Sequence, residues 1–185
     1  MFNKFRPALM ILVIGALAFS LGYVVFPHAE TLPGDIRSDA NSRIVLDPAA
    51  SAPDFVVHAL DGTAISSAEY KGKIMVVDFW ATWCGPCVAE LPNVKKTYTK
   101  FHKRGFEIVG ISLDSNKDKL TNFVEDNEMS WAQHFDGKGW KNKYAVEFGI
   151  QGIPAMWLID KKGDLVDMKA RAGLEAKVQK LLGKE

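Results

Sequence analysis

The 185-residue chain has only two cysteines, Cys84 and Cys87, and they lie three positions apart. No thiol is left over for a separate structural disulfide, and a structural zinc site would need two further ligands. The histidines are equally few and are scattered without the spacing of metal ligands: His28, His58, His102 and His134. We therefore expect no metal site and no cofactor, and we expect the two cysteines to act as a pair.

The sequence also lacks a strong charge of either sign, because 23 basic side chains face 22 acidic ones, for a net charge of +1. A nucleic-acid partner is therefore not expected. No internal repeat is present. Apolar residues make up 48% of the chain, which is enough for one domain with a hydrophobic core at this length.

A long uncharged stretch, Ala8–Phe26, follows an N-terminus that carries Lys4 and Arg6 but no acid. As a helix it would span about 28 Å, close to the roughly 30 Å of a bilayer's hydrocarbon core. The basic flank favours an N-terminus inside the cell and export of the rest. We predict a single-pass anchor over residues 1–27 in the cytoplasmic (inner) membrane, with the domain facing the periplasm or cell exterior. A signal peptide cleaved after residues 18–20, giving a secreted form, is the alternative.

Residues 28–52 are rich in Pro, Ala, Ser and Asp without periodicity, and we predict a linker there. The globular domain is predicted over residues 53–185. Its expected elements are strands over 53–57 and 63–65 around the Asp61-Gly62 turn, a turn or helix over 66–70, strands over 74–80 and 106–113, a helix over 116–127 capped by Ser115, a short helix over 139–148 packed through Trp140, Tyr144 and Phe148, strands over 155–159 and 165–169, and a helix over 174–182.

The cysteine pair lies between an apolar run and a helical pattern. Ile74–Trp80 is predicted to be a buried strand, and apolar residues at steps of three and four from Val88 onward predict a helix. Cys84 therefore falls at a helix N-terminus, where free N–H groups and the helix dipole favour a thiolate. Two residues of separation let the sulfurs meet across one turn, so Cys84 and Cys87 can alternate between dithiol and disulfide.

Position assigns different roles to the residues of this motif. Cys84 is predicted to be the more exposed and more activated thiol, and hence the nucleophile. Cys87, one turn further in, is predicted to be more buried and to resolve the mixed disulfide. Gly85 allows a partner backbone to approach, and Pro86 suits the first turn of a helix. Trp83 offers a flat exposed surface for docking or, alternatively, packs as an ordinary apolar residue.

Two carboxylates are placed to exchange protons with the pair. Asp78 lies inside the apolar strand, where a carboxylate is costly to bury. A raised pKa would suit Asp78 to accept a proton near neutral pH. Glu90 follows Cys87 by three residues and so lies on the same helix face. Alternatively, Glu90 is a solvated carboxylate near a helix start, where negative charge is favourable.

The segment VVDFWATWCGPC resembles the thioredoxin active site, and the resemblance extends over residues 53–183. The opening APDF…LDG…KGK, the pattern from Cys87 through Glu90 to Pro92 and the long connection over 114–148 are similar to the TlpA/ResA group of redoxin (AhpC/TSA) type. The resemblance implies a thioredoxin-like α/β fold, in which helices flank a central mixed sheet with an N-terminal hairpin and a central insertion. Peroxiredoxins share the opening, but their proline- and threonine-containing motif is not matched before Cys84.

The same resemblance implies roles for further residues. Pro154 would follow a cis peptide bond and lie against the cysteine pair, while Ile153 would offer backbone groups to an extended substrate. In thioredoxin, the aspartate that matches Asp78 accepts the proton of the second cysteine and pairs with a lysine on the neighbouring strand. Residues 106–113 contain no lysine, which leaves the tuning of Asp78 open. In the TlpA/ResA group, the glutamate matching Glu90 belongs to the active site.

The function implied is an extracytoplasmic thiol–disulfide oxidoreductase that reduces disulfides in exported proteins, for example an apocytochrome c. Its electrons would come from a membrane protein that serves as thiol-electron donor, because an oxidising compartment does not supply them. The Gly-Pro pair between the cysteines resembles the reducing members. Two alternatives are a disulfide-forming oxidant and a non-catalytic copper carrier that uses Cys84, Cys87 and His134.

Overall fold

The computed structural model describes residues 51–183. The predicted anchor and nearly all of the predicted linker lie outside the described residues. The elements, in chain order, are β1 Val56–His58, β2 Ala64–Ser66, the 3-10 helix η1 Ser67–Tyr70, β3 Ile74–Trp80, α1 Gly85–Phe101, η2 His102–Arg104, β4 Phe106–Ser112, α2 Lys117–Asp126, β5 Ala132–Phe135, η3 Gly139–Lys141, α3 Lys143–Glu147, β6 Ala155–Ile159, β7 Leu165–Asp167 and α4 Leu174–Leu182. Within this range no helix is both long and apolar enough to span a bilayer.

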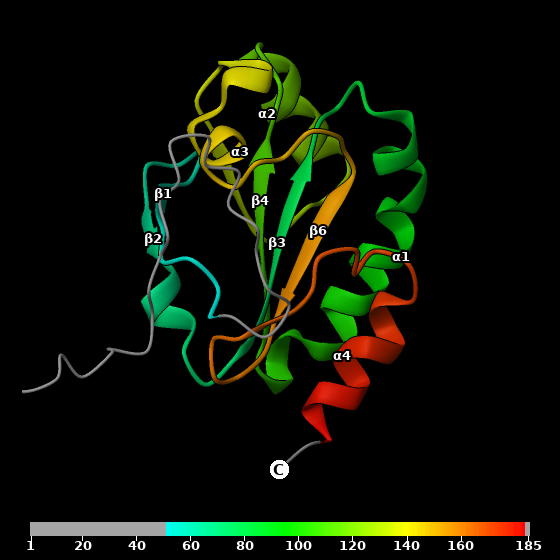
Figure 1. The fold of residues 1–185 in the computed structure, drawn as a ribbon. Coiled ribbons are helices and arrows are strands. Elements are labelled where there is room, and N and C mark those ends of the chain that lie inside the picture. The colour runs from blue at the N-terminus through cyan, green and yellow to red at the C-terminus, as the bar shows by residue number, and fades with distance from the viewer. Residues whose placement is uncertain (1–50, 184–185) are drawn as a thin grey trace, which may run out of the picture. The chain divides into compact units, whose positions relative to one another are not determined.

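A mixed five-stranded sheet forms the centre of the domain, with strand order β5-β4-β3-β6-β7. β3, β4 and β5 are parallel, whereas β6 runs antiparallel to β3 and β7 antiparallel to β6. Figure 1 shows α1 and α4 side by side along this sheet. The β1–β2 hairpin lies away from both helices, on the other side of β3 and β4 in this view. The arrangement is the thioredoxin-like α/β fold that the resemblance implied.

Strand β3 is the middle of the core, because neighbouring strands cover both of its edges and every one of its residues is buried. Continuous apolar sequence is what such a strand requires, since both faces of the sheet are covered. α1 buries one face against the sheet through Leu91, Val94 and Phe101. Two ion pairs, from Lys96 and Lys100 to Glu175, join α1 to α4 across their surface.

The β1–β2 hairpin lies along the outer edge of β5. The backbone N–H of Leu60 donates to the carbonyl of Gln133 at 2.9 Å, and Ala59 forms a bridge with His134. The Nδ1 atom of His134 also lies 2.8 Å from the carbonyl oxygen of His58. The hairpin thus closes the edge of the sheet that β5 would otherwise present.

Several boundaries differ from the sequence predictions. The cap of α2 is Asn116 rather than Ser115, because the Asn116 side chain accepts from the Lys119 N–H. The sequence analysis did not predict β5, and the single helix predicted over 139–148 is divided into η3 and α3. Asn142 causes this division, since it is extended and its side chain accepts from the first N–H groups of α3.

Candidate active site

One edge of the sheet gathers the loops that carry the predicted site. β3, β4 and β5 all end at this edge, and β6 begins there, because Ala155 pairs with Phe79 near the end of β3. Ligand and catalytic sites of open α/β sheets lie outside the carboxyl ends of the strands. The turn before α1, the loop after β4, the insertion loop after β5 and the Ile153–Pro154 segment therefore meet here.

Cys84 and Cys87 form a disulfide at the start of α1, with their Cα atoms 5.2 Å apart. Cys84 is the N-cap residue in an extended conformation, and its sulfur accepts from the backbone N–H of Cys87 at 3.3 Å. Gly85 and Pro86 form the first turn, where proline loses no helical hydrogen bond. A Cys84 thiolate would receive the same N–H, so the helix start stabilises the negative charge.

The exposure of the two cysteines differs from the prediction. Cys84 is 5% exposed and Cys87 is 3% exposed, so both are buried in the disulfide form. The expected contrast between an open and a covered sulfur is therefore small. Their distinction lies in position instead, because Cys84 caps the helix whereas Cys87 lies within its first turn.

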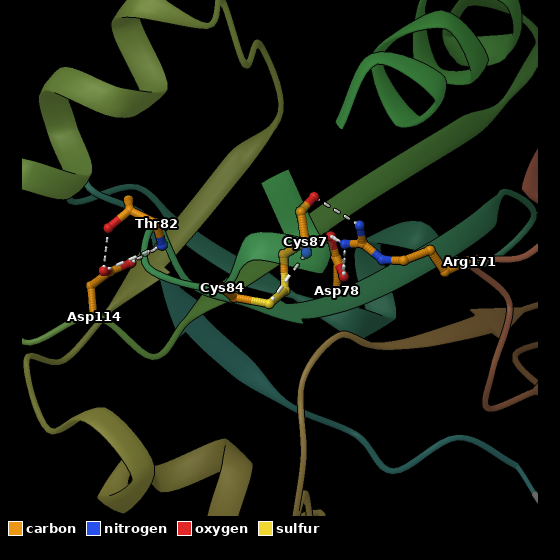
Figure 2. The surroundings of a disulfide bond; sticks show 6 residues. All are labelled: Asp78, Thr82, Cys84, Cys87, Asp114 and Arg171. Carbon is orange, nitrogen blue, oxygen red and sulfur yellow. Dashed lines mark hydrogen bonds and ion pairs between the residues drawn. A yellow bond between two sulfur atoms is a disulfide. The ribbon is translucent and has the colours of Figure 1, made fainter. Parts of the chain in front are cut away.

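Asp78 is paired with an arginine that the sequence analysis did not single out. Arg171, in the segment between β7 and α4, donates from Nη2 to both carboxylate oxygens of Asp78 at 3.0 and 2.9 Å. Its Nη1 donates to the carbonyl oxygen of Cys87 at 3.0 Å. The Asp78 and Arg171 side chains are only 6% and 13% exposed. One guanidinium group thus joins the buried acid to the first turn of α1, as Figure 2 shows.

Burial and pairing act in opposite directions on Asp78. Removal from water raises the pKa of the carboxyl, and the charge and hydrogen bonds of Arg171 lower it; burial is the larger effect, and the pKa lies above its usual range. A raised pKa suits a group that takes up a proton near neutral pH. Thioredoxin places a lysine on the neighbouring strand beside this acid, and β4 has none. Here the positive charge beside Asp78 comes instead from Arg171, in a distant part of the chain.

A second buried carboxylate fixes the other side of the turn. Asp114 is 3% exposed and accepts from the Thr82 backbone N–H at 3.0 Å and from the Thr82 hydroxyl at 2.7 Å. The Ser112 hydroxyl donates to Asp114 at 2.8 Å. In Figure 2 the disulfide lies between this group and the Asp78–Arg171 pair. The loop after β4 thus holds the residues just before Cys84 by charge-assisted hydrogen bonds.

Two tryptophans form an exposed aromatic surface beside the cysteines. Trp83 is 55% exposed and Trp140 is 48% exposed, and their ring centroids lie 6.2 Å apart. Trp140 was predicted to face the core, and that prediction was wrong. Its neighbours Tyr144 and Phe148 are buried as predicted, but η3 turns Trp140 outward against Trp83.

The remaining predicted residues lie at the same end of the sheet. The Ile153–Pro154 peptide bond is cis, which confirms the cis bond that the resemblance implied. Glu90 is half-buried on α1, and its side chain accepts from the Asn93 side chain at 3.1 Å. The catalytic role predicted for Glu90 and the substrate-binding roles predicted for Ile153 and Pro154 stay predictions.

His134, the third ligand of the copper alternative, is buried in β5 at 9% exposure. Its Nδ1 faces the His58 carbonyl, and its ring packs edge-on against Tyr144 at 5.0 Å. Across residues 51–183, no group of three His, Cys, Asp or Glu side chains is arranged to hold a metal ion. His134 thus has a structural role in attaching the hairpin to β5.

The fold and the site together are those of a protein-disulfide oxidoreductase of thioredoxin fold. A cysteine disulfide lies at a helix start at one end of the sheet, near a buried carboxylate. Comparison with known proteins agrees with this class: residues 48–168 match the AhpC/TSA family, and the chain belongs to that family. The thiol-disulfide oxidoreductase ResA of Bacillus anthracis is 30% identical over 163 residues, which cover 88% of this chain and 84% of the relative. A ResA of Bacillus cereus is 29% identical over 181 residues, covering 96% and 95% of the two chains.

Solved structures show the same fold. The thioredoxin domain of a thiol-disulfide oxidoreductase from Bacteroides vulgatus superposes with a TM-score of 0.67 and 31% identity, covering 75% of this chain and 99% of that one. A thiol:disulfide interchange protein of the thioredoxin family from Chlorobium tepidum gives a TM-score of 0.61 and 29% identity, covering 73% and 97%.

Proposed function

We propose that this protein is a membrane-anchored reductant of disulfides in exported proteins. The observation that carries the proposal is the Cys84–Cys87 disulfide at the N-terminus of α1, because that geometry lets one pair of thiols be oxidised while a substrate disulfide is reduced. The basic N-terminus followed by the apolar stretch Ala8–Phe26 supports an anchor with the domain outside the cytoplasmic membrane.

The reaction proceeds through two thiol–disulfide exchanges. The Cys84 thiolate attacks one sulfur of the substrate disulfide, which forms a mixed disulfide and releases the other substrate sulfur as a thiolate. Asp78 accepts the proton of Cys87, and the Cys87 thiolate attacks the Cys84 sulfur. The second substrate sulfur leaves as a thiolate, and both substrate thiolates take up protons. The substrate gains two electrons and the protein retains a Cys84–Cys87 disulfide.

Trp83 and Trp140 border the cysteines with exposed aromatic rings, so we propose that a substrate segment lies across them. The cis peptide at Ile153–Pro154 lies at the same end of the sheet, and its backbone is proposed to pair with that segment. The reduced dithiol must then be regenerated, for which we propose a thiol donor in the membrane. The names of the ResA relatives support a disulfide as substrate; apocytochrome c is one exported candidate.

The direction of catalysis is tested by the redox potential of the pair. We expect a value near the roughly −270 mV of thioredoxin, whereas a value near about −120 mV would make the protein a disulfide-forming oxidant instead. Insulin reduction with a chemical reductant should occur with the wild type and stop in Cys84→Ser. Wild-type protein that fails to reduce insulin would refute the enzymatic proposal.

The substrate and the location are tested in cells. Cys87→Ala should accumulate mixed disulfides through Cys84, and mass spectrometry of the trapped partners would identify exported proteins. The full-length protein should fractionate with membranes, and a membrane-impermeant thiol reagent should reach the reduced cysteines in intact spheroplasts. Labelling only after lysis would place the domain on the cytoplasmic side and contradict the proposed location.

A further inference from the structure

We propose that Arg171 is a positioning residue of the disulfide reaction, which opposes protonation of Asp78 and holds its carboxylate beside the first turn of α1. The inference rests on the proposed function, since it concerns the proton that Cys87 gives up when it resolves the mixed disulfide. Arg171 lies 93 residues from Asp78 in sequence, in the segment that leads into α4, and its side chain is largely buried.

The geometry of the guanidinium carries this inference. Nη2 is shared between the two oxygens of Asp78, while Nη1 donates to the carbonyl oxygen of Cys87, with all three distances at 2.9 to 3.0 Å. The planar group fixes both acceptors at once, which a lysine ammonium on a flexible stem does less well. Arg171 therefore sets the position of the acid relative to the residue whose thiol it serves.

The surroundings of Asp78 give Arg171 its importance. The residues opposite Asp78 on the neighbouring strands are Gly110 of β4 and Met156 of β6, neither of which carries a charge. α1 contributes the cysteine pair, and the buried residues of α4 are the apolar Leu174, Val178 and Leu182. Arg171 is thus the positive charge that opposes the burial of Asp78.

Removing this charge has a defined chemical consequence. Burial alone favours the neutral carboxylic acid, and a protonated Asp78 cannot accept the Cys87 proton. The Cys87 thiol would then lose its base near neutral pH, and resolution of the mixed disulfide would slow. Raising the pH would ionise Asp78 again and restore the rate.

The step can be isolated with a coloured leaving group. The full chain, purified in a mild detergent, is reduced and treated at low pH with Ellman's reagent, which leaves thionitrobenzoate on Cys84. A jump to the test pH then starts attack by Cys87, and thionitrobenzoate release reports the rate. Arg171→Met is expected to lower this rate at pH 7 by about tenfold or more, a factor of ten for each unit by which the pKa of Asp78 rises. The rising limb of the pH–rate profile should move to higher pH.

Three further variants separate positioning from a loss of structure. Arg171→Lys keeps the positive charge. The rising limb of its pH–rate profile should therefore lie closer to that of the wild type than the rising limb of Arg171→Met does. In an Asp78→Asn background, the pH–rate profile reports only the ionisation of the cysteine. Adding Arg171→Met should therefore leave its rising limb at the same pH. Arg104→Met, which removes an exposed arginine of η2, is the matched control and should behave as the wild type.

The outcomes are distinct. An Arg171→Met limb at the wild-type pH, or an equal effect of Arg171→Met with and without Asp78, would overturn the inference while leaving the dithiol chemistry intact. If Arg171→Met does not fold, the test falls to Asp78→Asn and the Asp78→Asn/Arg171→Met double variant: coincident pH–rate profiles would support the inference, and a further shift in the double variant would overturn it. Failure of the wild type to release thionitrobenzoate would instead refute the proposed function.

Discussion

The Asp78–Arg171 pair makes a prediction about stability that depends on pH. Removing one partner of a buried ion pair leaves an unpaired charge, which costs about 3–5 kcal/mol when the charge is retained. Asp78 can avoid part of this cost by taking up a proton, since its side chain is a weak acid. The free energy of unfolding of Arg171→Met therefore depends on how difficult that protonation is at each pH.

The size of the effect follows from the ordinary pKa of the carboxyl, 3.8. Each pH unit above that value adds about 1.36 kcal/mol to the free energy of protonation, so protonating Asp78 costs about 4.4 kcal/mol at pH 7 and about 1.6 kcal/mol at pH 5. These values are upper limits on the loss caused through Asp78. Loss of the hydrogen bond to the Cys87 carbonyl adds about 1 kcal/mol at both pH values.

The sign is that of a carboxyl whose pKa is higher in the folded protein than in the unfolded chain. Its protonated form is favoured by folding, so stability is retained at acidic pH and lost as the pH rises toward the folded pKa. The free energy of unfolding can be measured by guanidinium chloride denaturation of the oxidised full chain in detergent at pH 5 and pH 7. The value for Arg171→Met should fall much further below that of the wild type at pH 7 than at pH 5. Equal losses at both pH values would refute the reasoning. The Asp78→Asn/Arg171→Met double variant, which contains neither charge, should show no such pH dependence.

Three other variants test separate features. In Gly110→Ala, the added Cβ would lie 2.1 Å from Oε1 of Gln133, which accepts from the buried indole N–H of Trp80 at 2.9 Å. Thermal unfolding should therefore show a loss of about 1–3 kcal/mol in the free energy of unfolding. An unchanged midpoint would contradict this packing. Asp114→Asn weakens charge-assisted hydrogen bonds and should lower the free energy of unfolding by about 1.5–3 kcal/mol in denaturant titrations. The alkylation rate of the thiols in the reduced protein should also change. Wild-type values in both assays would show that Asp114 does not influence the cysteines. Trp140→Ala should change stability by less than about 0.5 kcal/mol but lower kcat/KM for insulin several-fold, with little effect on a small aromatic disulfide; equal effects on both substrates would argue against a docking surface.

Much of the fold and the cysteine site could be predicted because local sequence determines them. Ile74–Trp80 is apolar at every position except Asp78, which suits a strand that is covered on both faces. The Gly-Pro pair after Cys84 suits the first turn of a helix that follows such a strand. These are features of neighbouring residues, and the structure matches them to within one or two positions.

The rest depended on contacts between distant parts of the chain. Arg171 follows Asp78 by 93 residues, and the sequence around it, KARAG, contains nothing that points to Asp78 as its partner. β5 was missed because Gln133 and His134 are polar yet buried, which hides the alternation of an edge strand. Trp140 was placed in the core by its apolar character, although its exposure depends on the turn that Asn142 makes before α3.

The hairpin along β5 has a consequence for a protein that exchanges disulfides with other polypeptides. An open edge strand is a template for adding foreign strands, and it promotes aggregation. Here the hydrogen bond from Leu60 to Gln133 and the bridge between Ala59 and His134 occupy that template. At this edge of the described domain, a foreign strand would have to displace the hairpin before it could pair with β5.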